Sequence, residues 1–242
     1  PMNDGTGDRL HGWLHEAPGR PDAPLVVVVH GMTGCGESYY VRTSTRYLLD
    51  HGFAVLRLNL RGAGPTIPHC REQYLAGRSE DLRAVFDQLG QDRPLACMAY
   101  SLGGNMLLKY LGEEGEGSAL AAAVAISPPV DLAGTTVTFH RRRNALYIRY
   151  LLRFLVSDVF AMREAPEPAH AEALRRVRNV YQFDDRYIAP RYGFRSADHY
   201  YEVHSALPYL SAIRTPALVV HADDDPWIPA GALRGVDWAS NP

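Results

Sequence analysis

The stretch LACMAYSLGGN, residues 95–105, decides how this chain folds. Its first six residues predict a buried strand, and Asn105–Leu111 has helical spacing. Ala99 and Gly103 keep the positions two before and two after Ser101 small, as a sharp strand-to-helix turn requires. Such a turn lifts the serine hydroxyl clear of the sheet and sets a helix N-terminus beneath the reacting carbon. We therefore predict that Ser101 is a nucleophile; the alternative is a serine N-cap on a glycine-rich helix start.

The segments around this turn alternate between strand and helix patterns. Strands are predicted at Leu25–Val29, Leu95–Tyr100, Ala54–Asn59, Ala121–Ile126 and Ala217–His221, and helices at Ser38–His51 and Ser79–Leu89, with Ser79 as the N-cap of the latter. This series predicts an α/β fold, a mostly parallel sheet with helices on both faces. Ligands of such sheets bind outside the carboxyl ends of the strands.

The region 131–207 breaks this alternation, because helical patterns dominate it and no clear strand occurs. We predict a helical cap or lid inserted between core segments 1–130 and 208–242. Tyr147, Leu151, Leu152 and Leu155 have helical spacing and are expected either to line an apolar acyl pocket or to pack the insertion onto the sheet. The run Arg141–Arg143 is either a site for an anionic lipid headgroup, giving peripheral membrane contact, or a solvated helix face.

The loop His30-Gly31-Met32-Thr33-Gly34 follows the strand Leu25–Val29. Acyl transfer turns a carbonyl oxygen into an anion, which two backbone N–H groups can stabilise. We predict Met32 and Leu102 as these oxyanion donors. His30 is expected to brace the loop rather than carry protons; the alternative is an ordinary glycine turn. His30, Tyr100 and Tyr147 are also expected at the substrate-binding site.

An acid and a base are needed to activate the serine. After the strand Ala217–His221 comes Asp223-Asp224-Asp225-Pro226, and we predict Asp225 as the acid, with Asp224 as the second choice. The base of this arrangement should be a histidine after the acid, but all ten histidines precede Asp225. His199, His204 and His221 are weak candidates. We expect the base, with a final strand and helix of the sheet, beyond residue 242.

The composition narrows the function classes further. The 242 residues carry a formal net charge of −2, which gives no reason to expect a nucleic-acid partner. The three cysteines lack CxxC spacing, so neither a disulfide framework nor a metal site is expected. The chain has no apolar run of membrane-spanning length and no recognisable signal peptide, so a cytoplasmic location is expected. The oligomeric state is left open.

Several motifs together resemble the α/β-hydrolase family, and within it the embryogenesis-associated-protein-like (YheT-like) esterase branch. These motifs are HGMTG (30–34), NLRGAG (59–64), SEDL (79–82), YSLGGN (100–105), FDD (183–185), APRYGF (189–194) and DDP (224–226). The resemblance implies a serine esterase without a metal or organic cofactor, with Ser101 as nucleophile, Asp225 as acid and a histidine in a Gly-Gly-His-type loop. It also implies medium-chain esters, acylglycerols or phospholipids as substrates.

Two other functions remain open at this level. The same nucleophile could pass its acyl group to an alcohol or amine instead of water. A chain that kept the fold without its histidine could also be a non-catalytic binding protein. The leading prediction is a carboxylic-ester hydrolase that works through an acyl-enzyme at Ser101.

Overall fold

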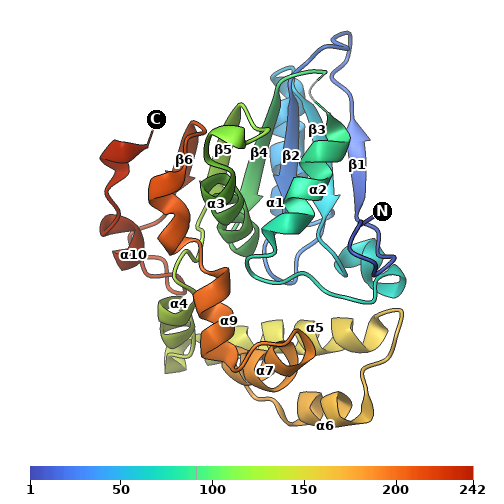
Figure 1. The fold of residues 1–242 in the computed structure, drawn as a ribbon, viewed down its shortest axis with the longest axis vertical. Coiled ribbons are helices and arrows are strands. Elements are labelled where there is room, and N and C mark those ends of the chain that lie inside the picture. Colours follow the sequence, from blue (N-terminus) through green and yellow to red (C-terminus); the bar gives the residue numbers. More distant parts are fainter. Residues whose placement is uncertain (91, 242) are drawn as a thin grey trace.

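A computed structural model describes residues 1–90 and 92–241 and contains one six-stranded sheet (Figure 1). The strands are β1 (His11–His15), β2 (Leu25–Val29), β3 (Ala54–Asn59), β4 (Leu95–Tyr100), β5 (Ala122–Ile126) and β6 (Ala217–Val220). Their order across the sheet is β1-β3-β2-β4-β5-β6, and only the β1–β3 pair is antiparallel. The mostly parallel sheet predicted from the sequence is thus confirmed. Strand β1 was not predicted, because HGWLH is a half-exposed edge strand without a continuous apolar run.

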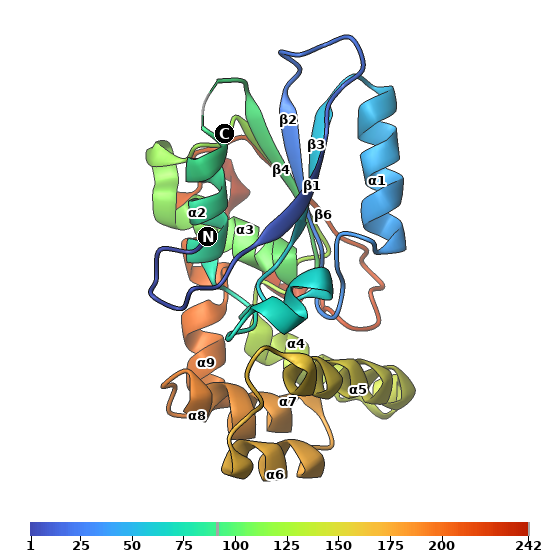
Figure 2. The ribbon, with the colours of Figure 1, turned by 90° about the vertical axis from the view of Figure 1, so that its right-hand side faces the viewer.

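Helices cover both faces of the sheet, as Figure 2 shows. On one face lies α1 (Tyr39–Asp50), and on the other lie α2 (Ser79–Leu89) and α3 (Leu102–Glu114). All five residues of β2 are buried, as expected for a central strand with helices on both sides. The prediction of Ser79 as an N-cap is wrong: Arg78 holds that position, and the buried Ser79 hydroxyl donates to Glu113 Oε2 at 2.5 Å.

A group of helices lies beyond the carboxyl ends of the parallel strands (Figure 1). It comprises α4 (Leu132–Phe139), α5 (Ala145–Ala161), α6 (Pro168–Arg176), α7 (Val180–Phe183), a π-helical turn (Asp184–Ile188), α8 (Ala189–Arg191) and α9 (Ala197–His204). No strand occurs in residues 131–207, all of which are described. We call these helices the cap; its apolar cluster is separate from that of the sheet. The division of the chain into core segments 1–130 and 208–242 and a cap at 131–207 stays a prediction.

The remaining short elements complete the described chain. They are α10 (Gly231–Arg234) and the 3₁₀ turns Gly64–His69, Gly115–Gly117, Arg142–Asn144, Leu207–Ala212 and Trp238–Ser240. Within residues 1–90 and 92–241, no helix is long and apolar enough to cross a membrane.

A buried arginine ties the N-terminal segment to the core. The Arg61 side chain is only 1% exposed and makes a two-pronged contact with Asp81, with Nε–Oδ2 and Nη2–Oδ1 distances of 3.0 and 2.6 Å. It also forms ion pairs with Asp8 (3.2 Å), Asp4 (2.7 Å) and Glu72 (3.7 Å). Burial alone would lower the pKa of Arg61, but the hydrogen bonds and charges of Asp81 and Asp4 raise it. The guanidinium therefore stays charged inside the protein and joins the N-terminal segment, the end of β3 and α2.

Candidate active site

Ser101 occupies a strained turn between β4 and α3. Its backbone has φ 50° and ψ −120°, a left-handed conformation that few residues other than glycine adopt. The Ser101 N–H still donates to the Ile126 carbonyl of β5 at 2.8 Å, so the strand ladder runs up to the turn. A Cβ on Gly103 would lie 2.5 Å from the His30 carbonyl oxygen, which explains the small residue there. This geometry is the strand-turn-helix context that the sequence motif requires.

The loop after β2 passes directly beside Ser101. A Cβ on Gly31 would lie 2.9 Å from Ser101 Cβ, so only glycine lets this loop come so close. Two amides of the loop have protein acceptors: Gly31 N–H donates to the Tyr40 hydroxyl at 3.0 Å, and Thr33 N–H to the Tyr74 hydroxyl at 2.8 Å. The Met32 N–H between them has no acceptor among residues 1–90 and 92–241.

A second amide without a protein acceptor belongs to Leu102, the first residue of α3. The first N–H groups of a helix have no carbonyl one turn earlier to receive them, and no other described residue accepts from Leu102 N–H. Met32, Leu102 and Ser101 all line one cavity. The structure thus brings together the serine and the two amides that the sequence predicts as oxyanion donors.

His30 lies beneath the loop, not in the cavity. Its side chain is fully buried, and burial lowers the pKa of the ring to about 4, so the imidazole is neutral at pH 7. Nδ1 lies 2.7 Å from the Gly31 carbonyl, and Nε2 accepts from Leu60 N–H at 3.1 Å. These partners place the proton on Nδ1. The ring ties the loop to the end of β3, which corrects the prediction that His30 contacts substrate.

Asp225 is set apart from its two acidic neighbours. Asp223 and Asp224 are exposed, whereas Asp225 is half-buried and lines the cavity with Ser101. Its Oδ1 accepts from the amides of Trp227 and Ile228 at 2.8 and 2.9 Å. These two hydrogen bonds fix the direction of the carboxylate. Of the three aspartates, only Asp225 lines the cavity that contains Ser101.

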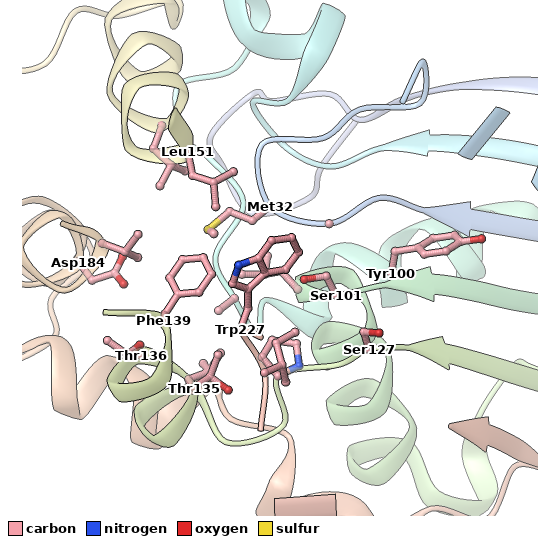
Figure 3. Close-up of a pocket in the computed structure, with 18 of the residues that line it drawn as sticks. Met32, Tyr100, Ser101, Ser127, Thr135, Thr136, Phe139, Leu151, Asp184 and Trp227 are labelled. Atoms are coloured by element: carbon pink, nitrogen blue, oxygen red, sulfur yellow. The ribbon is translucent and has the colours of Figure 1, made fainter. Parts of the chain in front are cut away.

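The cavity has a volume of about 340 Å³ and lies between the strand ends and the cap (Figure 3). Its wall is mainly apolar, with Met32, Phe139, Leu151 and Trp227 around the space in front of Ser101. Its size is at the lower end of the range for small-molecule sites. This lining fits a ligand whose carbonyl group lies at Ser101 and carries an apolar chain.

The predicted cavity residues of α5 have different positions. Tyr147, Leu151 and Leu155 line the cavity, and the Tyr147 ring stacks on Trp227 with centroids 4.1 Å apart. Leu152 is buried in the apolar cluster of the cap instead. One side of α5 therefore forms part of the cavity wall, while Leu152 packs within the cap rather than onto the sheet; an acyl chain in the cavity stays a prediction.

Tyr100 borders the cavity, but its ring points away from it (Figure 3). Its hydroxyl is 2.5 Å from Ser44 Oγ on α1, and its ring lies 4.7 Å from that of Tyr40. Because Tyr100 is among the residues that line the cavity, its contact with substrate stays a prediction. The ring belongs to the packing between the sheet and α1.

No histidine among the described residues lines the cavity. His221 Nε2 is bound to the Ile228 carbonyl at 3.0 Å, and His199 Nδ1 accepts from the Arg195 amide. His204 is buried against Tyr200 and Phe194 in the cap. The three weak candidates for the base are thus held elsewhere.

The sequence assigned no role to Asp184, which lies on the opposite side of the cavity from Ser101 (Figure 3). The residue is 8% exposed, and its Oδ2 accepts from the Tyr201 hydroxyl at 2.6 Å. Burial raises the pKa of Asp184 to about 7. The residue begins the π-helical turn, a feature often found at functional sites. Asp184 belongs to the FDD motif (183–185), which contributes to the family resemblance. The helical or strand periodicity of the sequence gives no sign that this motif lies at the cavity.

Asp184 should make stability depend on pH. In the unfolded chain it loses its proton near pH 4, but in the folded protein only near pH 7. Between these values the folded state holds one more proton, so its contribution is complete below about pH 4 and lost as the pH rises through 7. Relative to Asp184→Asn, the wild type should lose roughly 3 kcal/mol of unfolding free energy between pH 5 and pH 8.

Urea unfolding at several pH values measures this loss. Asp198→Asn is the matched control, because Asp198 is an exposed aspartate of the same cap. Its curve should run parallel to that of the wild type. A wild-type curve parallel to that of Asp184→Asn would show that Asp184 is ionised in the folded protein at pH 5.

Comparison with known proteins identifies the family. The alpha/beta hydrolase fold family matches residues 24–241, nearly the whole chain. The chain belongs to this family. Among solved α/β hydrolases, the Pyrococcus furiosus esterase Pf2001 has a TM-score of 0.60 at 18% identity, covering 96% of this chain and 74% of that one. At this identity the likeness concerns the fold alone.

Curated relatives agree with the branch that the motifs resemble. YheT of Escherichia coli is 31% identical over 223 residues, which are 89% of this chain and 65% of YheT. The monoacylglycerol lipase of Saccharomyces cerevisiae is 29% identical, covering 90% of this chain and 51% of the relative. Embryogenesis-associated protein EMB8 of Picea glauca is 26% identical, with coverages of 96% and 52%. This α/β hydrolase therefore spans about half to two thirds of the relatives it matches.

Proposed function

We propose that this α/β hydrolase cleaves carboxylic esters through an acyl-enzyme on Ser101. The observation that carries the proposal is that Ser101 lines one cavity with Met32 and Leu102, whose amides have no acceptor among residues 1–90 and 92–241. A carbonyl carbon at the serine would place its oxygen near both donors. The esterase and lipase names of the curated relatives support the same reaction class.

In the proposed reaction, Ser101 Oγ attacks the ester carbonyl while a base takes its proton. The oxyanion accepts hydrogen bonds from the Met32 and Leu102 amides, and then the alcohol leaves with the proton. Water attacks the acyl-enzyme in the second half, releasing the carboxylic acid and restoring the serine. Asp225 would orient the base, a histidine, and stabilise its charged form. None of the histidines described here is given that role, because none reaches the cavity.

The apolar wall supports an ester with a hydrocarbon acyl chain as the substrate class. Such a chain would contact Leu151, Leu155 and Phe139, each of which lines the cavity. Burying apolar surface there would supply binding energy of about 25 cal/mol for each Å² removed from water. Relatives named for monoacylglycerol, phospholipid and medium-chain fatty acid ester substrates support this choice.

A fluorophosphonate probe tests the nucleophile directly in the protein encoded by the full gene. The probe bonds covalently to activated serines, so peptide mapping should find it on Ser101. Ser127 is an internal control, because it lines the same cavity and also has a positive φ, 48°. Labelling of Ser127 with Ser101 unmodified would refute the proposed role of Ser101.

A further inference from the structure

The outer side of α5 exposes large apolar residues to solvent. Leu146, Tyr150 and Phe154 follow one another at intervals of four, and are 80%, 58% and 41% exposed. Residues four apart share one face of a helix. The opposite half of α5 is buried in the cap through Ile148, Leu151, Leu152, Leu155 and Val159. The helix is therefore apolar on both sides, although only one side has a partner within the described protein.

Arginines surround these exposed apolar residues. Arg141–Arg143, Arg149 and Arg153 are all exposed, and none has an ion-pair partner among residues 1–90 and 92–241. The only acidic residue between positions 141 and 163 is Asp158, which is partly buried. We call Arg141–Arg143, Leu146, Arg149, Tyr150, Arg153 and Phe154 the α5 face. This concentration of positive charge occurs in a chain whose formal net charge is −2.

The combination on the α5 face identifies the chemistry of its partner. Arginines that form no ion pair attract anionic groups, while a row of leucine and aromatic side chains needs an apolar medium beside them. A bilayer with anionic lipids offers both within a few ångströms. The 17 residues of α5 form a rod of about 25 Å that can lie along such a surface. Figure 2 shows α5 along one side of the cap, nearer to the sheet than α6.

We propose that the α5 face docks the cap onto the surface of an anionic membrane, with α5 lying in the plane of the interface. Leu146, Tyr150 and Phe154 insert among the acyl chains near the headgroups, and the arginines bind the lipid phosphates. The inner side of the same helix contributes Leu151 and Leu155 to the cavity wall. The docking surface and the proposed acyl site thus share one helix.

Sedimentation with lipid vesicles tests the docking without requiring turnover. The protein should sediment with vesicles of phosphatidylcholine and phosphatidylglycerol, and much less with phosphatidylcholine alone. Arg149→Glu/Arg153→Glu should lower the partition coefficient roughly 30-fold or more, since each basic residue near the surface contributes about fivefold and the two glutamates add repulsion. Tyr150→Ser/Phe154→Ser should lower it about tenfold. Raising the salt concentration should weaken binding of the wild type.

Variants on α1 are the matched controls, because they alter exposed residues of the same types. Arg42, Arg46 and Tyr47 lie on α1, and Tyr47 is 62% exposed. Arg42→Glu/Arg46→Glu and Tyr47→Ser should bind anionic vesicles like the wild type. Equal losses in the α1 and α5 variants would overturn the proposal, because general charge would then explain the binding.

Two further outcomes would also overturn it. Equal binding to vesicles of both compositions would remove the role of the arginines. A concentration-dependent dimer in light scattering that Tyr150→Ser/Phe154→Ser converts to monomer would show that a second copy covers the face. Vesicle binding by a protein that hydrolyses no ester would support the docking while refuting the proposed catalytic function, so the two can fail separately.

Discussion

Replacing Ser101 by alanine is expected to lower ester hydrolysis by about 10³-fold or more. The substitution removes the atom that attacks the carbonyl, while the Met32 and Leu102 amides stay in place. Alanine retains the Cβ, so the backbone of the turn and the cavity shape should change little. What remains is the catalysis that oxyanion binding alone provides, which is small because no acyl-enzyme can form. The Michaelis constant should change much less than the turnover number.

The measurement compares p-nitrophenyl esters of short, medium and long chain length in the protein encoded by the full gene. Ser127→Ala is the matched control, because Ser127 lines the same cavity at the end of β5. It should keep hydrolysis within about tenfold of the wild type, since no step of the mechanism uses its hydroxyl. If Ser101→Ala retains wild-type turnover, the serine mechanism is excluded.

Replacing Arg61 by methionine should destabilise the protein by about 3–5 kcal/mol. Methionine fills much of the same volume but leaves the carboxylates of Asp8 and Asp81 without their cation. Both are at most 1% exposed, so water cannot solvate them as charges. Removing one partner of a buried ion pair is costly for this reason. Replacing both partners by apolar residues need not be costly.

Thermal unfolding and urea titration both measure this effect. In a chain of this length, the loss corresponds to a fall in the melting temperature of roughly 6–20 °C. Arg93→Met is the control, because Arg93 pairs with Glu16, whose side chain is 55% exposed. An exposed pair contributes at most about 1 kcal/mol. Equal losses in the two variants would contradict the view that burial makes the Arg61 pair special.

The sequence predicts the sheet well where strands are buried on both faces. β2 and β4 have the bounds predicted, because a continuous apolar run admits few other structures. Strand β1 gave no such signal, since its role depends on pairing with β3 at an edge. The detailed path of the cap could not be predicted either. Its helices are fixed by packing between distant segments, as the Tyr201–Asp184 hydrogen bond illustrates.

At the candidate site, the sequence predicted the course of the backbone better than the directions of the side chains. The small residues around Ser101 and the glycines beside Met32 follow from steric rules that short motifs express. The orientation of Tyr100 depends on which strand face meets α1, and the motif is silent on this. Asp184 was missed as a cavity residue for a related reason. It lies 83 positions after Ser101, and only the folded cap brings it to the opposite wall.

The left-handed backbone of Ser101 has an evolutionary consequence. At φ 50° glycine would be relaxed, whereas a side chain at this position costs about 1–3 kcal/mol. Selection for thermal robustness alone would therefore favour glycine at position 101. A catalytic role of the Ser101 hydroxyl would offset this cost. Under the proposed mechanism, the most stable version of this chain and the most reactive version therefore differ at this residue.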